Sequence, residues 1–291
     1  MKDFQWHRFW QAGAFAACLL GCCCLVFASE TVLRKFGLVS TPQIFREFDL
    51  VSKDWQHYAG DFIAFVKGIN RLYLPVLFGV PLVFLLHYIV IGPKKFAHSG
   101  KRIWFYSGAT RFLHWASAIF FSLLVVTGLM IIFAKFIGGG PLVLSARTIH
   151  LWSAYGFLAV AAPLFIVWIK DMLPAPYDLL WLLKAGGYLS RKKQEIPAGK
   201  FNFGQKMWFW LAFLGSAVMF YTGYCVSIMA GQQAEMAGFI KIHLILGLCI
   251  LAFFITHLYM SLFAIKGSLR SMISGYKWEE EVRILHGRML R

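Results

Sequence analysis

The last apolar run of the sequence, residues 241–265, carries two histidines whose spacing suits metal chemistry. His243 and His257 lie fourteen residues apart. On an α-helix, fourteen steps of about 100° end within about 40° of the starting direction, so both imidazoles project from nearly the same face. At about 1.5 Å rise per residue they lie roughly 21 Å apart along the axis. A run of this length can cross a bilayer, and ionisable residues inside such a helix are candidates for function.

The composition is that of an integral membrane protein. Of the 291 residues, 59% are apolar and 14% are charged, with a mean hydropathy of +0.64. A soluble domain is about half apolar and a quarter charged. Several apolar runs approach or exceed the length of a helical span. These runs are 10–28, 72–92, 112–134, 148–169, 208–229 and 241–265. We therefore predict an all-α membrane protein, a bundle of about six transmembrane helices.

The charge distribution predicts how the bundle is oriented. The net charge is +16, and most Lys and Arg fall in segments that would share one side of the membrane. Basic residues crowd cytoplasmic loops, so we expect both termini in the cytoplasm and no binding of nucleic acid. The basic segments are 1–9, 93–111, 170–207 and 266–291. The run 10–28 also resembles a signal peptide ending at Ala28, but we expect it to be retained as a helix.

Two more histidines lie at matching depths in this topology. His114 lies at the cytoplasmic start of the third run and His150 at the outer start of the fourth. His114 and His257 are expected at the same depth near the cytoplasmic side, and His150 and His243 at the same depth near the outer side, so we predict these two pairs. Two bis-histidine sites at two depths are the arrangement of a di-haem cytochrome b, and two axial ligands leave no open position, which favours electron transfer. There is no CxxCH motif for covalent haem attachment. A haem-free transporter or anchor, with the histidines as a polar relay, is the alternative.

Other residues near the histidines have two interpretations each. Arg111 and Arg147 each precede a predicted ligand by three residues, on the same helical face. They either pair with haem propionates or are ordinary flanking charges. His87 is intramembrane with no partner left at its depth, and we interpret it as structural. Four glycines within the spans would admit either a flat macrocycle or a neighbouring helix. These glycines are Gly128, Gly156, Gly223 and Gly247.

Several motifs between about residues 105 and 277 occur in the order of one known family. They are RFLHW, RTIHLW, GKFNFGQKMWFW, IHLILGL, THLYMSL and KGSLRSMISG. In these the chain resembles the membrane cytochrome b (gamma) subunit of respiratory formate dehydrogenases. The four histidines alone are also shared with cytochrome b subunits of nickel–iron hydrogenases, whereas the KFNFGQK segment favours formate dehydrogenase. The first ~100 residues and the short C-terminal tail depart from the family pattern.

The resemblance implies a membrane electron-transfer subunit in the bacterial inner membrane. It implies two haem b groups, a periplasmic catalytic subunit that oxidises formate, and an iron–sulfur subunit that passes on the electrons. It also implies that menaquinone is reduced on the cytoplasmic side. The heterotrimer formed by the three subunits is expected to form an oligomer. The implied quinone residues are Asn202, Gly204, Gln205 and His257. The alternative is a quinone-reducing subunit of another periplasmic dehydrogenase, such as a nickel–iron hydrogenase.

These inferences divide the chain into five parts. Residues 1–28 form the N-terminal helix and 29–71 a periplasmic segment. Residues 72–110 form an extra span with a cytoplasmic loop. Residues 111–266 form a four-helix di-haem core, and 267–291 form a cytoplasmic tail.

Overall fold

The computed structural model describes residues 53–97, 100–228 and 233–290. The predicted first span, 10–28, and the start of the following segment lie outside these residues. The chain divides into two compact units. The first contains the described residues 53–61 together with Ser122–Ser153, and the second contains Phe62–Phe121 and the chain from Ala154 onward.

Among the described residues, five helical runs are long and apolar enough to cross a membrane. They are Ala59–Val90, Gly108–Ile132, Gly140–Met172, Phe203–Ile228 and Met236–Ala264. Each exceeds the length that a ~30 Å hydrocarbon layer requires. The prediction of an all-α, multi-pass membrane protein is therefore confirmed.

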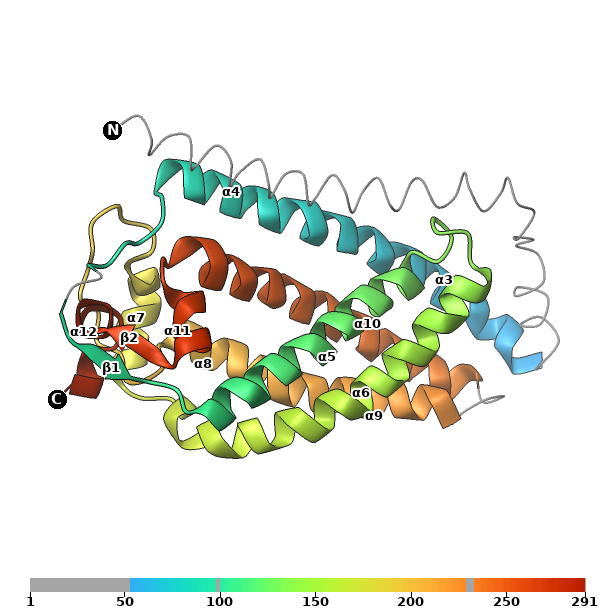
Figure 1. Ribbon diagram of the computed structural model, residues 1–291. Helices are drawn as coiled ribbons and strands as arrows, with labels where there is room; N and C mark the ends of the chain where they lie inside the picture. Colours follow the sequence, from blue (N-terminus) through green and yellow to red (C-terminus); the bar gives the residue numbers. More distant parts are fainter. Residues whose placement is uncertain (1–52, 98–99, 229–232, 291) are drawn as a thin grey trace. The chain divides into compact units, whose positions relative to one another are not determined.

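The first described span is longer than the sequence indicated. Helix α3 (Lys53–Leu74) runs through the π-helical turn η1 (Pro75–Gly79) into α4 (Val80–Val90), as Figure 1 shows. The sequence was divided at residue 71, with 29–71 predicted as a periplasmic segment. The structure continues the helix through residues 59–71, whose apolar residues recur at helical spacing. The irregular turn begins at Pro75, which lacks the N–H that a regular α-helix would use.

The other four spans are formed by three unbroken helices and one joined pair. They are α5 (Gly108–Ile132), α6 (Gly140–Trp168) with its 3₁₀ extension Ile169–Met172, α8 (Phe203–Trp210) joined to α9 (Ser216–Ile228), and α10 (Gln233–Tyr259). The π-helical turn η4 (Leu211–Gly215) joins α8 to α9, and η5 (Met260–Ala264) extends α10. A π turn closes i→i+5 hydrogen bonds and so holds one residue more than an α turn.

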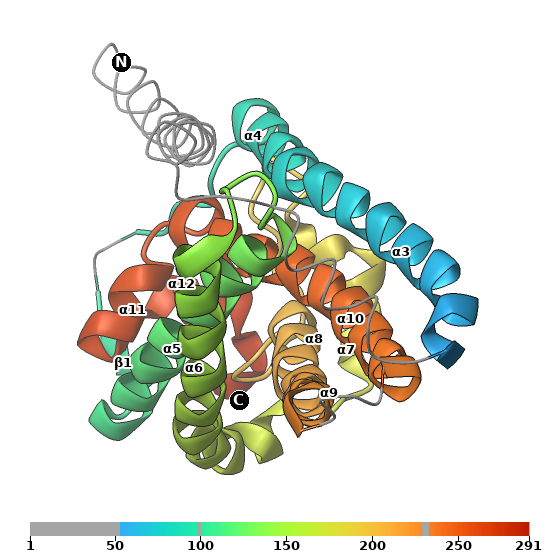
Figure 2. The ribbon, with the colours of Figure 1, turned by 90° about the vertical axis from the view of Figure 1, so that its right-hand side faces the viewer.

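Within the second unit, α10 packs beside α9, and α4 packs against α10 (Figures 1 and 2). The Tyr73 hydroxyl of α3 donates to the Leu244 carbonyl at 2.7 Å. Near the other end of the contact, His87 Nδ1 lies 2.6 Å from the Tyr259 hydroxyl, and His87 Nε2 lies 2.9 Å from the Tyr188 carbonyl. The contacts with Leu244 and Tyr259 attach the span Ala59–Val90 to α10 at two points.

Short elements at one end of the second unit enclose an aromatic cluster. They are β1 (Arg102–Trp104), α7 (Tyr177–Leu183), α11 (Ser268–Ser274), β2 (Tyr276–Trp278) and α12 (Glu279–Leu285), which we call the cap. The two strands pair antiparallel, with Ile103 opposite Lys277. The cluster is buried, and the burial of its apolar side chains stabilises this end of the unit. It contains Phe105, Tyr106, Leu164, Trp168, Met172, Phe201, Phe209 and Val282.

Candidate functional site

The first predicted pair of histidines lies together in the second unit. The rings of His114 on α5 and His257 on α10 have centres 6.4 Å apart and planes inclined at 54°. Two imidazoles on opposite sides of one metal, each with a metal–nitrogen bond of about 2 Å, have centres roughly 6 Å apart. Nδ1 of His114 is buried and has no hydrogen-bond partner in the described part of the chain. The spacing therefore fits one metal held between the two rings.

The surroundings of this pair of imidazoles are aromatic. In the part of the chain that the structure describes, no three His, Cys, Asp or Glu side chains group closely enough to hold a metal ion. Indole rings pack on the two imidazoles instead: Trp208 stacks on His257 at 5.3 Å, and Trp168 lies 6.3 Å from His114. A flat apolar macrocycle such as haem fits a site with two imidazoles and aromatic walls.

The third predicted ligand, His150, lies in the first unit against a threonine. Thr127 Oγ1 lies 2.9 Å from Nδ1 of His150 and 2.6 Å from the Leu123 carbonyl. A hydroxyl has one proton, and here it is directed to the carbonyl oxygen, so the His150 ring donates its Nδ1–H to the hydroxyl. In the neutral ring, this hydrogen bond leaves the lone pair on Nε2, and that tautomer can bind a metal through Nε2.

His243, in the second unit, has the same environment. Thr222 Oγ1 lies 2.9 Å from Nδ1 of His243 and 2.8 Å from the Val218 carbonyl. Thr222 is buried, so this hydrogen bond is shielded from water. Each of the two histidines predicted for the outer site thus meets a threonine on the preceding span, and each is oriented by it.

A glycine follows each of these threonines and leaves room for the imidazole. A Cβ added at Gly128 would lie 3.3 Å from Cε1 of His150, and one added at Gly223 would lie 3.4 Å from Cε1 of His243. The sequence reasoning missed the threonines. The signal was a Thr-Gly pair on the span before each histidine, 127–128 and 222–223.

The other two span glycines serve helix packing. A Cβ at Gly156 would collide with the Phe120 ring, and a Cβ at Gly247 would lie 2.8 Å from the Tyr73 hydroxyl. Small residues allow such close approaches between helices. Of the two uses that the sequence left open, close approach of a neighbouring helix is thus present at Gly156 and Gly247, and room for a macrocycle stays a prediction.

The two predicted propionate partners differ in their surroundings. Arg111 donates to the Ile273 carbonyl near the end of α11, and its Nε is buried with no partner among the described residues. That nitrogen could bind an anionic oxygen of a bound group. Arg147 is exposed on α6, in the first unit.

The predicted quinone residues lie at the start of α8, where two of them cap the helix. Asn202 Oδ1 accepts from the Gln205 backbone N–H, and Gln205 Oε1 accepts from the Asn202 N–H, both at 3.0 Å. This capping box uses both amide oxygens. Gly204 lies under Trp181, where a Cβ would come within 2.7 Å of the indole ring. The fourth predicted residue, His257, is on α10. It contacts Trp208 of α8, which lies one turn after Gly204.

An apolar cavity of about 380 Å³ lies beside this helix. Its walls come from α8, η4 and α10, and include Phe203, Met207, Trp210 and Phe253. Among the described residues that line it, Lys206 is the one with a charge. Small-molecule sites are typically 300–1,000 Å³, largely apolar, with few polar groups.

Comparisons with known proteins agree with a haem-binding membrane protein. Residues 105–275 match the family model of the prokaryotic cytochrome b561. The chain is 25% identical over 177 residues to the cytochrome b556(Fdn) subunit of the nitrate-inducible formate dehydrogenase of Escherichia coli K12, covering 57% of this chain and 79% of that subunit.

Two further relatives are also cytochrome b556 subunits of formate dehydrogenases. The cytochrome b556(fdo) subunit of formate dehydrogenase from Escherichia coli K12 is 25% identical over 200 residues, covering 61% of this chain and 92% of that subunit. The formate dehydrogenase cytochrome b556 subunit of Haemophilus influenzae is 25% identical over 176 residues, covering 57% and 73%. Since the family model matches more than half of its length, the chain belongs to the prokaryotic cytochrome b561 family, whose members are membrane electron-transfer cytochromes that bind haem b.

Proposed function

We propose that this chain is the membrane subunit of a formate dehydrogenase complex and passes electrons from a periplasmic iron–sulfur subunit to menaquinone. The names of its relatives support the assignment to such a complex. The proposal places the chain in the bacterial inner membrane with both termini in the cytoplasm, as the distribution of basic residues predicts. Residues 111–266 form the electron-transfer core of this proposal, and three-subunit units associate into a larger oligomer.

Four histidines hold two haems in this proposal. His114 and His257 form the inner site, and His150 and His243 form the outer site. Haem b in these sites would supply two one-electron carriers. The observation that carries the proposal is the 6.4 Å spacing of the His114 and His257 rings, together with the threonine hydrogen bonds that orient His150 and His243.

The direction of transfer has an energetic consequence. An electron that moves inward opposes a membrane potential that is negative inside, at about 2.3 kcal/mol per 100 mV. The difference in redox potential between formate and menaquinone supplies that work. Quinone reduction on the cytoplasmic side also consumes protons there, so both processes contribute to the proton-motive force.

The haem assignment is tested by removing one ligand at a time. We expect His114→Ala and His150→Ala each to lose one haem per chain, measured by the pyridine haemochrome absorbance of the purified protein. Formate-to-quinone activity should be lost in both variants. His87→Leu, which changes an intramembrane histidine outside both pairs, should keep two haems. Two haems in either alanine variant would contradict the assignment.

The identity of the donor is tested by purification in mild detergent. We expect a molybdenum- or tungsten-containing subunit and an iron–sulfur subunit to remain bound to this chain. Recovery of a nickel–iron subunit would identify the complex as a hydrogenase instead of a formate dehydrogenase. The assignment of the haem ligands would stay the same. A colourless protein after expression with ample haem would exclude the electron-transfer proposal altogether.

A further inference from the structure

A charged cavity of about 530 Å³ lies in the second unit, where two membrane spans reach their ends. The span Gly140–Met172 ends beside this cavity, and the span Phe203–Ile228 begins beside it. The ends of membrane spans lie at the boundary between hydrocarbon and water, so the cavity lies at the depth of lipid headgroups. Its charged lining residues are Lys170, Asp171, Lys200, Lys206 and Arg288.

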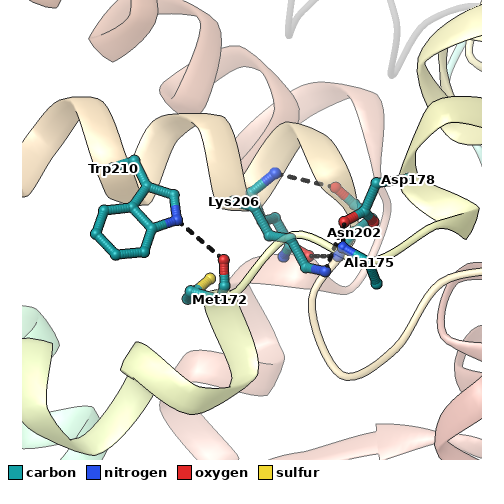
Figure 3. Close-up of polar contacts among 7 residues, drawn as sticks. Met172, Ala175, Asp178, Asn202, Lys206 and Trp210 are labelled. Atoms are coloured by element: carbon teal, nitrogen blue, oxygen red, sulfur yellow. Dashed lines mark hydrogen bonds and ion pairs between the residues drawn. The ribbon is translucent and has the colours of Figure 1, made fainter.

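The lining of the charged cavity has an excess of positive charge. Two of its lysines are neutralised by ion pairs, of which Figure 3 shows the second: Lys200 with Asp171 at 3.0 Å, and Lys206 with Asp178 at 2.8 Å. Lys170 and Arg288 are exposed, and neither forms an ion pair within the described chain. Two cations without a carboxylate partner make the cavity attractive to an anion.

The chain around Arg288 fixes the position of its guanidinium. The Arg288 backbone N–H donates to the Ala198 carbonyl at 3.0 Å, which ties the C-terminal turn to the loop before α8. The guanidinium lies 4.8 Å from the centroid of the Tyr177 ring, where it is attracted by the ring face. A guanidinium presents donors that match two oxygens of a phosphate group. Arg288 is therefore placed to bind a phosphate ester in the cavity.

The apolar cavity of about 380 Å³ adjoins the charged one, because Pro174 and Lys206 line both. No polar atom of the described residues faces the apolar cavity, and none of the predicted quinone residues lines it. It extends from the headgroup depth along α8 and η4 toward Cys249 and Phe253 on α10. Both of these residues are exposed, so the cavity opens on the hydrocarbon-facing surface. The two cavities together fit a ligand with an anionic head and an apolar chain.

The rim of the charged cavity is also apolar. Leu173 lines the cavity and is 53% exposed. On the neighbouring helix α7, Leu179 and Leu183 are 64% and 75% exposed. Exposed leucines at the depth of the headgroups insert among the lipids. A ligand with an apolar chain therefore reaches this cavity from the bilayer.

We propose that the charged cavity binds the phosphodiester of an anionic phospholipid and that the apolar cavity holds one of its acyl chains. Lys170 and Arg288 bind the phosphate. Basic pockets between membrane spans commonly bind anionic headgroups. A zwitterionic lipid would bring its own cation into a cavity that already has an excess of positive charge, so it binds less tightly. This inference depends on the membrane location of the chain and not on its electron donor or on quinone.

Binding of phosphatidylglycerol to the full-length, haem-loaded protein tests the proposal. The protein is washed free of lipid in mild detergent and titrated, and native mass spectrometry gives the Kd of the most tightly bound lipid. A Lys170→Gln, Arg288→Gln double variant should raise this Kd about tenfold or more, since each basic residue near anionic lipid contributes roughly fivefold. Phosphatidylethanolamine with the same acyl chains should bind the unchanged protein about tenfold more weakly.

Two further sets of variants make the result specific. A Lys184→Gln, Lys192→Gln double variant also removes two exposed charges between α6 and α8, but from residues that line neither cavity. We expect its Kd to equal that of the unchanged protein. Cys249→Phe should weaken binding about threefold or more, because the added ring occupies space of the acyl chain, which then loses packing contacts. Cys249→Ala should bind as the unchanged protein does.

The outcomes decide between a lipid and other ligands. An equal Kd for the Lys170→Gln, Arg288→Gln variant and the unchanged protein would overturn the proposal, as would equal binding of the two lipids. Displacement of the lipid by an equal concentration of glycerol 3-phosphate would show a site for soluble phosphate esters and overturn it too. If the double variant does not assemble with haem, Lys170→Gln alone decides: a roughly fivefold rise in Kd supports the headgroup site, and an unchanged Kd overturns it. An unchanged Kd in Cys249→Phe would overturn the placement of the acyl chain.

Discussion

Thr127 accepts a hydrogen bond from Nδ1 of His150 at 2.9 Å while directing its own proton to the Leu123 carbonyl. Thr222 and His243 repeat this relationship at 2.9 Å. Nδ1 of His114, by contrast, is buried with no partner in the described chain. The two outer ligands in our proposal are thus more strongly polarised than His114, and their basicity should be higher.

Thr127 and Thr222 should therefore lower the redox potential of the outer haem. Replacing Thr127 or Thr222 by valine removes a hydrogen bond of about 1 kcal/mol, and the less basic imidazole stabilises the ferric haem less. We expect the potential of the outer haem to rise by roughly 40 mV, measured by a spectroelectrochemical titration, with two haems retained. Thr148→Val is the control, because Thr148 bonds only the Leu144 carbonyl among the contacts described here. A shift in the inner haem alone would contradict the assignment.

The glycine beside each outer ligand should control haem retention. Gly128→Ala or Gly223→Ala places a methyl group 3.3–3.4 Å from the imidazole, closer than most such contacts, so the ring must tilt. We expect the outer haem to be lost more readily during purification, by about tenfold in affinity, as measured by haem per chain. Gly68→Ala is the control, since nothing lies within 4 Å of the added carbon. Equal haem content in all three variants would contradict the close packing.

His87 should stabilise the bundle without binding haem. Its two ring nitrogens contact the Tyr259 hydroxyl and the Tyr188 carbonyl. His87→Leu leaves both groups without this partner, and we expect the free energy of unfolding to fall by about 1–3 kcal/mol. Thermal unfolding in detergent, followed by tryptophan fluorescence, measures the loss. If the variant instead loses a haem, His87 would be a ligand and the pairing of the four histidines would be wrong.

His286 should make the stability of the cap depend on pH. Burial lowers the pKa of this imidazole well below 6.5, and the nearby Lys277 charge lowers it further, while a hydrogen bond with the Gly199 carbonyl opposes the shift. The unfolded chain therefore binds a proton before the folded one does. Stability should be full above pH ~6.5 and should fall as the pH decreases below it. We expect His286→Phe to flatten this dependence, as measured by the rate of trypsin cleavage in the cap between pH 7 and 5.

The sequence predicted the membrane spans better than it predicted the residues that contact the histidines. Apolar length and charge asymmetry are properties of whole segments, so the five described spans could be predicted from composition alone. The Thr127–His150 and Thr222–His243 contacts depend on how neighbouring helices face each other, which a single sequence does not contain. The early start of α3 at Lys53 was missed because a few charges outweighed its helical periodicity.

The contacts of the polar residues at the start of α8 could also not be predicted from the sequence. Asn202 and Gln205 were predicted as quinone contacts from a resemblance, and their proposed role stays a prediction. The structure adds that their amide oxygens cap the helix. Asn202 also forms a hydrogen bond with the Tyr188 phenol, whose pKa is raised by burial. The buried pair of Lys206 and Asp178 could not be predicted, because the two residues lie 28 positions apart in a segment without strong periodicity.

The π turn at Leu211–Gly215 sets the rotation of the α9 side chains about the helix axis relative to those of α8. Trp208 precedes it and stacks on His257, and Thr222 follows it and hydrogen bonds His243. If the same five residues wound as an ordinary α-helix, the backbone would no longer accommodate the extra residue that a π turn holds. Every side chain beyond the turn would then rotate by about 100° relative to those before it. The contacts with His257 and His243, which lie about four turns apart along this helix, therefore both depend on the π turn.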